Sequence, residues 1–148
     1  MKTIFLFAST IVIGLISRSQ DIVQWNFSVK NIADKTYEIH LTPTLQNLWH
    51  IYSQTSPEGG AIPTKISFNK NPLLSIEGKT KEIGKIISKY EEVFEITVKY
   101  FEGSVDFVQL VKLKNKIKTN ISGTIEFMAC NNEQCASPKT VPFIVKLE

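Results

Sequence analysis

Alternation of apolar and polar residues with a period of two is the feature of this sequence that most constrains its fold. It runs through residues 23–29, 37–41, 94–100, 121–127 and 141–147. Such alternation is typical of strands that bury one face and expose the other. Shorter candidate strands lie at 49–53, 64–68, 73–77 and 105–113. Together these segments predict about nine strands.

Polar or Gly/Pro-rich connectors separate the predicted strands, at 31–35, 56–60, 69–72, 102–103 and 115–120. No segment shows a convincing amphipathic helix. Many short strands joined by frequent turns predict an all-β fold, an immunoglobulin-like antiparallel β-sandwich. The Cys…Trp…Cys arrangement of antibody domains is absent. A chain of 148 residues suits one domain with its own core.

Four lysines alternate near the end of one predicted strand, at Lys112, Lys114, Lys116 and Lys118. Charged side chains of this kind commonly keep a sheet edge from pairing with another chain. We therefore expect a solvated face that protects an edge. A docking patch for a partner protein is the alternative.

Residues 1–19 are typical of a secretory signal peptide. Lys2 gives a positive start, residues 4–16 are mostly apolar, and Ser17 and Ser19 are small residues before the expected cleavage site. Cleavage after Ser19 would leave residues 20–148 as a single exported domain. Arg18 lies beside that site, so an uncleaved membrane anchor is the alternative.

Composition and motifs argue against several classes of function. The formal net charge is +3, and its positive residues are dispersed, so a nucleic-acid-binding surface is not expected. Phosphate-binding loops, nucleophile elbows and zinc-protease motifs are absent. His40 and His50 are far in sequence from both cysteines, and we expect His40 to be solvated on the polar side of its strand. Neither a metal nor a cofactor is expected.

The two cysteines, Cys130 and Cys135, lie between two predicted strands and are separated by four polar residues. A disulfide across so short a loop would stabilise the domain by about 2 kcal/mol, against about 4–5 kcal/mol for a loop of a hundred residues. A short exposed loop does leave the sulfurs open to in-line attack by a thiolate. On these residues alone, redox exchange and an inert structural disulfide both stay open.

Several further blocks accompany the cysteines. The most specific is 123–130, followed by Cys135 and Pro138, and the others are 48–53, 59–64, Tyr90, Phe94 and 100–107. In this pattern, over roughly residues 23–147, the chain resembles the N-terminal periplasmic domain of the DsbD thiol:disulfide interchange protein.

The resemblance implies an immunoglobulin-like periplasmic domain that relays two electrons through its cysteine pair, here Cys130 and Cys135. Its partners would be a membrane electron-transfer protein and thioredoxin-like proteins, with cytochrome c maturation among the destinations. The chain would be a monomeric component of such a relay rather than a complete enzyme. Aromatic side chains shield the pair in that family. Tyr52 is the best match for one of them, with Trp49 as a further shielding or docking residue.

Three departures from that family bear on these expectations. Four residues separate the cysteines, where better-known members have five. The stretch matched to the family's cap loop, 79–84, lacks the usual Phe, and Ile83 would take its place. The chain ends at Glu148, so the membrane and thioredoxin-like parts of a relay are expected on other chains.

The implied mechanism begins with a donor thiolate that attacks one sulfur, and a second donor thiol then releases the reduced pair. We expect Cys135 to be the attacked sulfur, because Cys130 directly follows a strand and should be partly buried. Glu133 within the loop disfavours a thiolate, so activation would come from the docked partner. Two alternatives are an exported β-sandwich that binds a protein and has a purely structural disulfide, and a domain that has lost turnover and now regulates or scaffolds.

Overall fold

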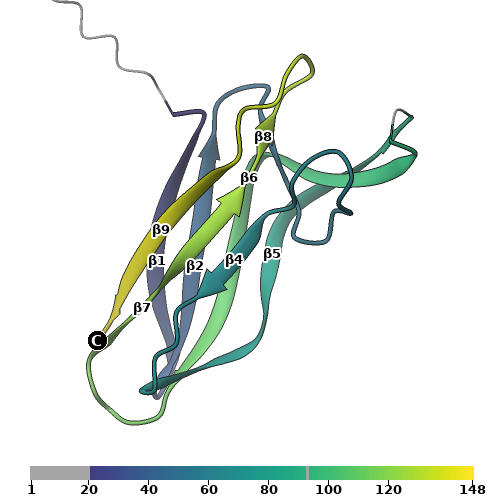
Figure 1. Cartoon of the computed structure of the whole chain (residues 1–148). Coiled ribbons are helices and arrows are strands. Elements are labelled where there is room, and N and C mark those ends of the chain that lie inside the picture. Colours follow the sequence, from purple (N-terminus) through teal and green to yellow (C-terminus); the bar gives the residue numbers. More distant parts are fainter. Residues whose placement is uncertain (1–20, 93) are drawn as a thin grey trace, which may run out of the picture.

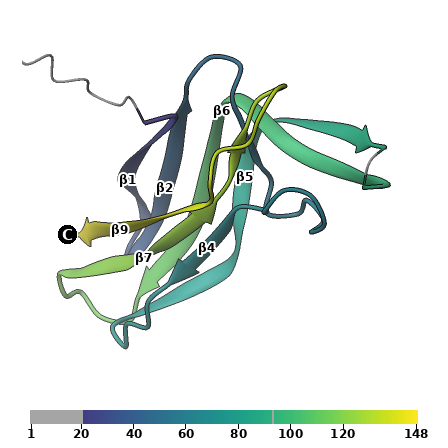
Figure 2. The same cartoon turned by 45° about the horizontal axis from the view of Figure 1, so that its top comes forward.

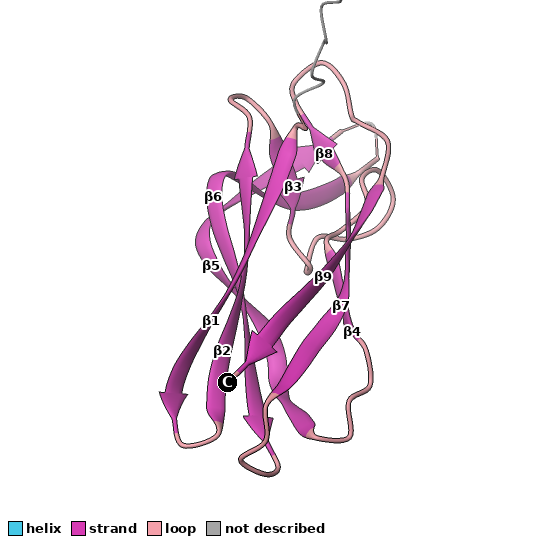
Figure 3. Cartoon of the chain, turned by 90° about the vertical axis from the view of Figure 1, so that its left-hand side faces the viewer, coloured by secondary structure: helices cyan, strands magenta, loops and turns pink. Residues whose placement is uncertain are grey.

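The computed structural model describes residues 21–92 and 94–148, so the predicted signal peptide at 1–19 lies outside the described residues. The described residues form two antiparallel sheets that face each other, as Figures 1 and 3 show. The all-β sandwich predicted from the alternation is therefore confirmed. Within this part of the chain, no helix has the length and apolar character needed to cross a membrane.

The nine strands divide unequally between the sheets. The smaller sheet has the order β4-β7-β9, whereas the larger has the order β1-β2-β6-β3-β8 and includes β5 as a second partner of β6. The strand bounds are β1 (Val23–Ala33), β2 (Thr36–Leu45), β3 (His50–Tyr52), β4 (Lys65–Phe68), β5 (Leu74–Glu91), β6 (Ile96–Leu113), β7 (Thr119–Phe127), β8 (Ala129–Cys130) and β9 (Lys139–Leu147).

The hydrophobic core lies between the two sheets. Ile39 of β2 and Phe107 of β6 point inward from the larger sheet, and Ile125 and Phe127 of β7 point inward from the smaller one. Trp25 of β1 joins both layers, because its ring packs on Phe107 at 5.8 Å and on Phe127 at 5.4 Å between centroids. Burial of each such side chain contributes about 1.5–3 kcal/mol, which explains the strict alternation of these strands.

Two long strands depart from the predicted pattern. β6 is one strand of 18 residues, although the sequence predicted two strands separated by a turn at 102–103. Gly103 adopts a φ of 78° within it, a conformation that suits glycine and lets the strand bend without ending. β5 pairs with β6 along its length, so residues 79–84 belong to a strand and not to the expected cap loop. Figure 2 shows the far ends of β5 and β6 projecting from the sandwich as an arm.

The prediction that four lysines protect a sheet edge is wrong. Lys112 pairs with Thr36 of β2 on one side and with Ser75 of β5 on the other, so this part of β6 has no free edge. Lys114, Lys116 and Lys118 follow in the connector between β6 and β7. Their charges are exposed, and ion pairs such as that of Lys116 with Asp34 contribute little to stability.

A testable consequence of the packing concerns Gly123 of β7. A Cβ atom there would collide with the backbone oxygen of Ser67 and lie 2.7 Å from the ring of Phe143. We expect Gly123→Ala to lower the free energy of unfolding by about 1–3 kcal/mol, measured by chemical denaturation. Asn120→Ala, on an exposed position of the same strand, should change it by less than about 0.5 kcal/mol. Equal stability of the two variants would contradict the close packing at Gly123.

Candidate functional site

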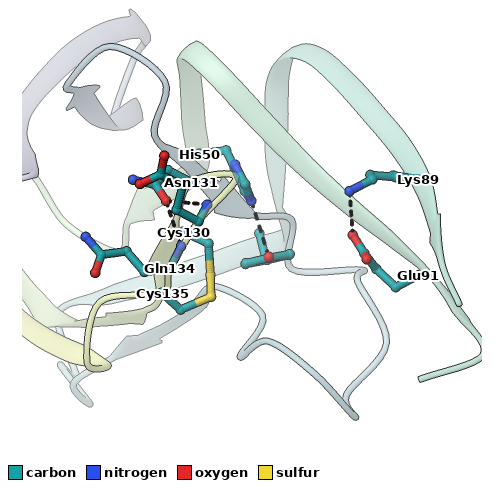
Figure 4. Close-up of a disulfide and its surroundings, with 9 residues drawn as sticks. His50, Lys89, Glu91, Cys130, Asn131, Gln134 and Cys135 are labelled. Atoms are coloured by element: carbon teal, nitrogen blue, oxygen red, sulfur yellow. Dashed lines mark hydrogen bonds and ion pairs between the residues drawn. A yellow bond between two sulfur atoms is a disulfide. The ribbon is translucent and has the colours of Figure 1, made fainter. Parts of the chain in front are cut away.

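Cys130 and Cys135 form a disulfide, which Figure 4 shows with its surroundings. It closes the loop that follows β8, at one end of the sandwich (Figure 1). β8 pairs with β3, so that Cys130 is opposite His50 and Ala129 is opposite Ile51. This pairing fixes Cys130 within the larger sheet, where it is only 2% exposed. Cys135 follows the loop and is exposed. The two cysteines therefore differ in access, as their positions relative to the predicted strand suggested.

Asn131 closes the loop between the cysteines. Its side-chain oxygen accepts hydrogen bonds from the backbone N–H groups of Glu133 at 2.9 Å and Gln134 at 2.8 Å. Its own backbone N–H donates to the carbonyl of Gln134 at 2.9 Å. Asparagine commonly closes turns in this way. These hydrogen bonds help to hold Cys135 beside Cys130 independently of the S–S bond.

Aromatic side chains surround the buried cysteine. Residues opposite each other on antiparallel strands share a face of the sheet, which places Cys130 with His50 and Tyr52 of β3 and with Tyr100 of β6. Tyr52 is 8% exposed and belongs to the same small apolar cluster as Cys130. Nε2 of His50 lies 3.2 Å from the Tyr52 hydroxyl, and the rings of His50 and Tyr100 are 4.4 Å apart.

Burial changes the acid–base properties of this cluster. It lowers the pKa of His50, with Glu102 and Glu91 partly opposing the change and Lys89 adding to it. Burial also raises the pKa of Tyr52, with smaller contributions from Glu91 and Tyr100. Desolvation disfavours the charged form of each group, so both side chains are neutral at neutral pH.

An open hollow of about 590 Å³ reaches this cluster from solvent. A larger hollow of about 790 Å³ lies along residues 54–66, but neither a cysteine nor a histidine lines it. The smaller hollow is therefore the candidate site. Its lining comes from β3, β5, β6, β8 and the connectors: His50, Tyr52, Gly60, Ala61, Lys89, Glu91, Phe94, Val98, Tyr100 and residues 130–135.

Phe94 is one of several lining residues that the sequence did not mark as part of the site. It precedes β6 on the projecting arm, is 53% exposed, and packs on Gly60, where an added Cβ would lie 3.0 Å from its ring. An aromatic side chain outside residues 79–84 therefore lines the hollow. Phe94 was part of the resemblance, but its place in the lining of the hollow depends on the length of β5.

The structure does not bring Ile83 or Trp49 to the disulfide. Ile83 is 59% exposed on β5 opposite Asp106, and it does not line the hollow. Its neighbour Glu82 instead anchors the segment after Tyr52, accepting 2.7 Å hydrogen bonds from the Ser53 hydroxyl and the Gln54 backbone N–H. Trp49 is partly buried and packs against the main core.

The two histidines lie in different surroundings. His40, expected in solvent, is partly buried on β2, and its Nδ1 lies 2.7 Å from a carboxylate oxygen of Asp106. His50 is buried beside Cys130. Among residues 21–92 and 94–148, no group of three or more His, Cys, Asp or Glu side chains is arranged to hold a metal ion.

These features define an immunoglobulin-like β-sandwich with a half-covered disulfide at one end. No protein-family model matches the sequence, and no curated protein matches it either. Solved structures do match. The N-terminal periplasmic domain of ScsB from Proteus mirabilis is 17% identical, with a TM-score of 0.58 over 90% of this chain and 49% of that chain.

Two further matches come from Neisseria meningitidis. The DsbD N-terminal domain in its reduced form is 11% identical, with a TM-score of 0.51 over 82% of this chain and 83% of that one. The complex between the DsbD and PilB N-terminal domains gives 10% identity and a TM-score of 0.54, over 87% and 86%. The chain therefore shares the fold of the N-terminal periplasmic domains of DsbD and ScsB. It spans about half the length of the matched ScsB chain.

We predict that the ring of Phe94 restricts access to the disulfide. Phe94→Ala should be reduced several-fold faster than the wild type by a small dithiol such as dithiothreitol, because an incoming thiolate must approach along the S–S axis. Ile83→Ala, at an exposed apolar residue of β5 outside the hollow, is the matched control and should react at the wild-type rate. An unchanged rate in Phe94→Ala would show that its ring does not shield the sulfurs.

Proposed function

We propose that residues 20–148 are a periplasmic thiol–disulfide exchange domain that relays two electrons through Cys130 and Cys135. The observation that carries the proposal is the difference between the two cysteines. Cys135 is exposed beside an open hollow, whereas Cys130 is held in a sheet and is 2% exposed. This arrangement offers one sulfur to a partner and keeps the other for the intramolecular step.

In the reductive half-reaction, a donor thiolate attacks Sγ of Cys135. The S–S bond breaks, Cys130 leaves as a thiolate and gains a proton, and the donor is joined to Cys135. A second donor thiolate then attacks the donor's own sulfur in this mixed disulfide and releases Cys135. The domain gains two electrons and two protons, and the donor leaves as a disulfide.

In the oxidative half-reaction, Cys135 attacks the disulfide of an acceptor and Cys130 then resolves the mixed disulfide. Glu133 lies within the loop, and residues 131–134 include no Lys, Arg or His. A carboxylate near a thiol disfavours its thiolate, so docking of a partner would supply the activation. This suits a domain that exchanges electrons with selected proteins.

The proposed partners are a membrane electron-transfer protein and thioredoxin-like proteins. The matched DsbD N-terminal domain forms a complex with the PilB N-terminal domain, which supports a docked protein as the source or destination of electrons. The ScsB domain is described as periplasmic, which supports the same compartment for this chain. The low exposure of Cys130 favours one alternative, a protein-binding sandwich with a structural disulfide.

The reduction potential distinguishes these two functions. We expect equilibration with a glutathione redox buffer to give a value in the range from thioredoxin to protein disulfide isomerase, about −270 to −180 mV. The measurement is the fraction of alkylated cysteines by mass spectrometry at each buffer ratio. A potential below about −300 mV would assign the bond to the structural class and contradict the proposal.

Variants of single cysteines test which sulfur meets the partner. Cys130→Ala should fold, lose about 2 kcal/mol of stability, and capture thioredoxin-like proteins from a periplasmic extract as mixed disulfides on Cys135. Cys135→Ala is the matched control and should capture few, because Cys130 is buried. Non-reducing electrophoresis with mass spectrometry identifies the adducts. Equal capture by the two variants would refute the proposed order of attack.

A further inference from the structure

Burial of Cys130 creates a chemical requirement that the cysteines themselves do not meet. Its thiol must lose a proton before it can resolve a mixed disulfide, and its thiolate must regain one after leaving. At 2% exposure, direct exchange of that proton with bulk water is restricted. Desolvation also disfavours a lone thiolate. A neighbouring group that can accept a proton would lower this barrier.

His50 lies where such a group is needed. It is directly opposite Cys130 across the β3–β8 pair, and opposite residues of antiparallel strands have Cβ atoms about 4.5–5.5 Å apart on the same face. Figure 4 shows His50 beside the strand that carries Cys130. His50 is 9% exposed, its ring lies tilted against that of Tyr100, and its Nε2 is 3.2 Å from the Tyr52 hydroxyl.

The charges around His50 come from two other strands. Glu102 of β6 pairs with His50 on the side of β3 that faces away from β8. Lys89 and Glu91 of β5 form an ion pair of 3.0 Å. The two glutamates favour the protonated ring, while burial and Lys89 oppose it. The net effect leaves the imidazole neutral and able to accept a proton at neutral pH. Tyr52 is excluded as the acceptor, because its raised pKa keeps it protonated.

We propose that His50 accepts the proton of the Cys130 thiol during resolution of a mixed disulfide on Cys135, an assignment that rests on the proposed exchange function. The Cys130 thiolate attacks Sγ of Cys135, the intramolecular S–S bond forms, and the bond to the partner's sulfur breaks. The partner leaves as a thiolate. The two cysteines are oxidised by two electrons, and the partner's former disulfide is reduced. In the reverse direction, the imidazolium protonates the departing Cys130.

The test follows the resolving step without any physiological partner. When the reduced domain reacts with Ellman's reagent, attack by Cys135 releases one thionitrobenzoate, in a phase that depends on reagent concentration. Attack by Cys130 on the adduct releases a second in a first-order phase. Stopped-flow absorbance over a series of pH values measures both. Gln replaces His50 in the first variant, since its amide can still hydrogen-bond to Tyr52 but accepts no proton.

We expect His50→Gln to slow the second phase by about a hundredfold at neutral pH and to leave the first phase unchanged. The deficit should shrink as pH rises, because hydroxide then removes the Cys130 proton. His40→Gln is the matched control, since His40 is paired with Asp106 away from the disulfide, and both of its phases should equal those of the wild type. Circular dichroism checks folding, and His50→Asn replaces the first variant if that one is unfolded.

Two results would overturn the assignment: a second phase in His50→Gln as fast as in the wild type, or one slowed by the same factor at every pH. The latter would show that His50 only positions its neighbours. A potential in the structural range combined with a His50-dependent second phase would refute the exchange function and support the His50 assignment. A reduction potential in the exchange range, together with a second phase that does not depend on His50, would support the exchange function and refute the His50 assignment.

Discussion

The pairing of β8 with β3 is the interaction on which the candidate site depends. It is very short, yet it places Cys130 in the sheet opposite His50 and leaves Cys135 in the loop. One cysteine is consequently buried and the other exposed, although only four residues separate them. Because backbone hydrogen bonds rather than the disulfide set this difference, it is expected to persist when the disulfide is reduced.

The arm formed by the ends of β5 and β6 lines the side of the hollow away from the cysteine loop. Both strands extend past the sandwich (Figure 2). Tyr100 of β6 and Phe94, just before β6, line the same hollow as the two cysteines. Glu82 of β5 also holds the segment after Tyr52 by two hydrogen bonds. The site is therefore assembled from four strands and three connectors.

Neutral groups dominate the inner part of the site. Burial keeps His50 and Tyr52 uncharged, and the charged side chains nearby are either exposed or paired. No basic residue lies within the cysteine loop to stabilise a thiolate on Cys135. Such a site would exchange electrons mainly with proteins that dock over it, whereas a positively charged surrounding would activate the thiol toward many oxidants.

The sequence by itself determined the sandwich, the loop between Cys130 and Cys135, and the burial of the first cysteine. The reason is that a strand with one buried face alternates apolar and polar residues along the chain. Tertiary structure decided the rest. Residues 79–91 are mostly exposed on both faces and carry no alternation, so β5 exists through its pairing with β6. That pairing placed Phe94 in the lining of the hollow and Ile83 outside it. The pairing of β3 with β8 placed His50 opposite Cys130, which no local sequence pattern indicates.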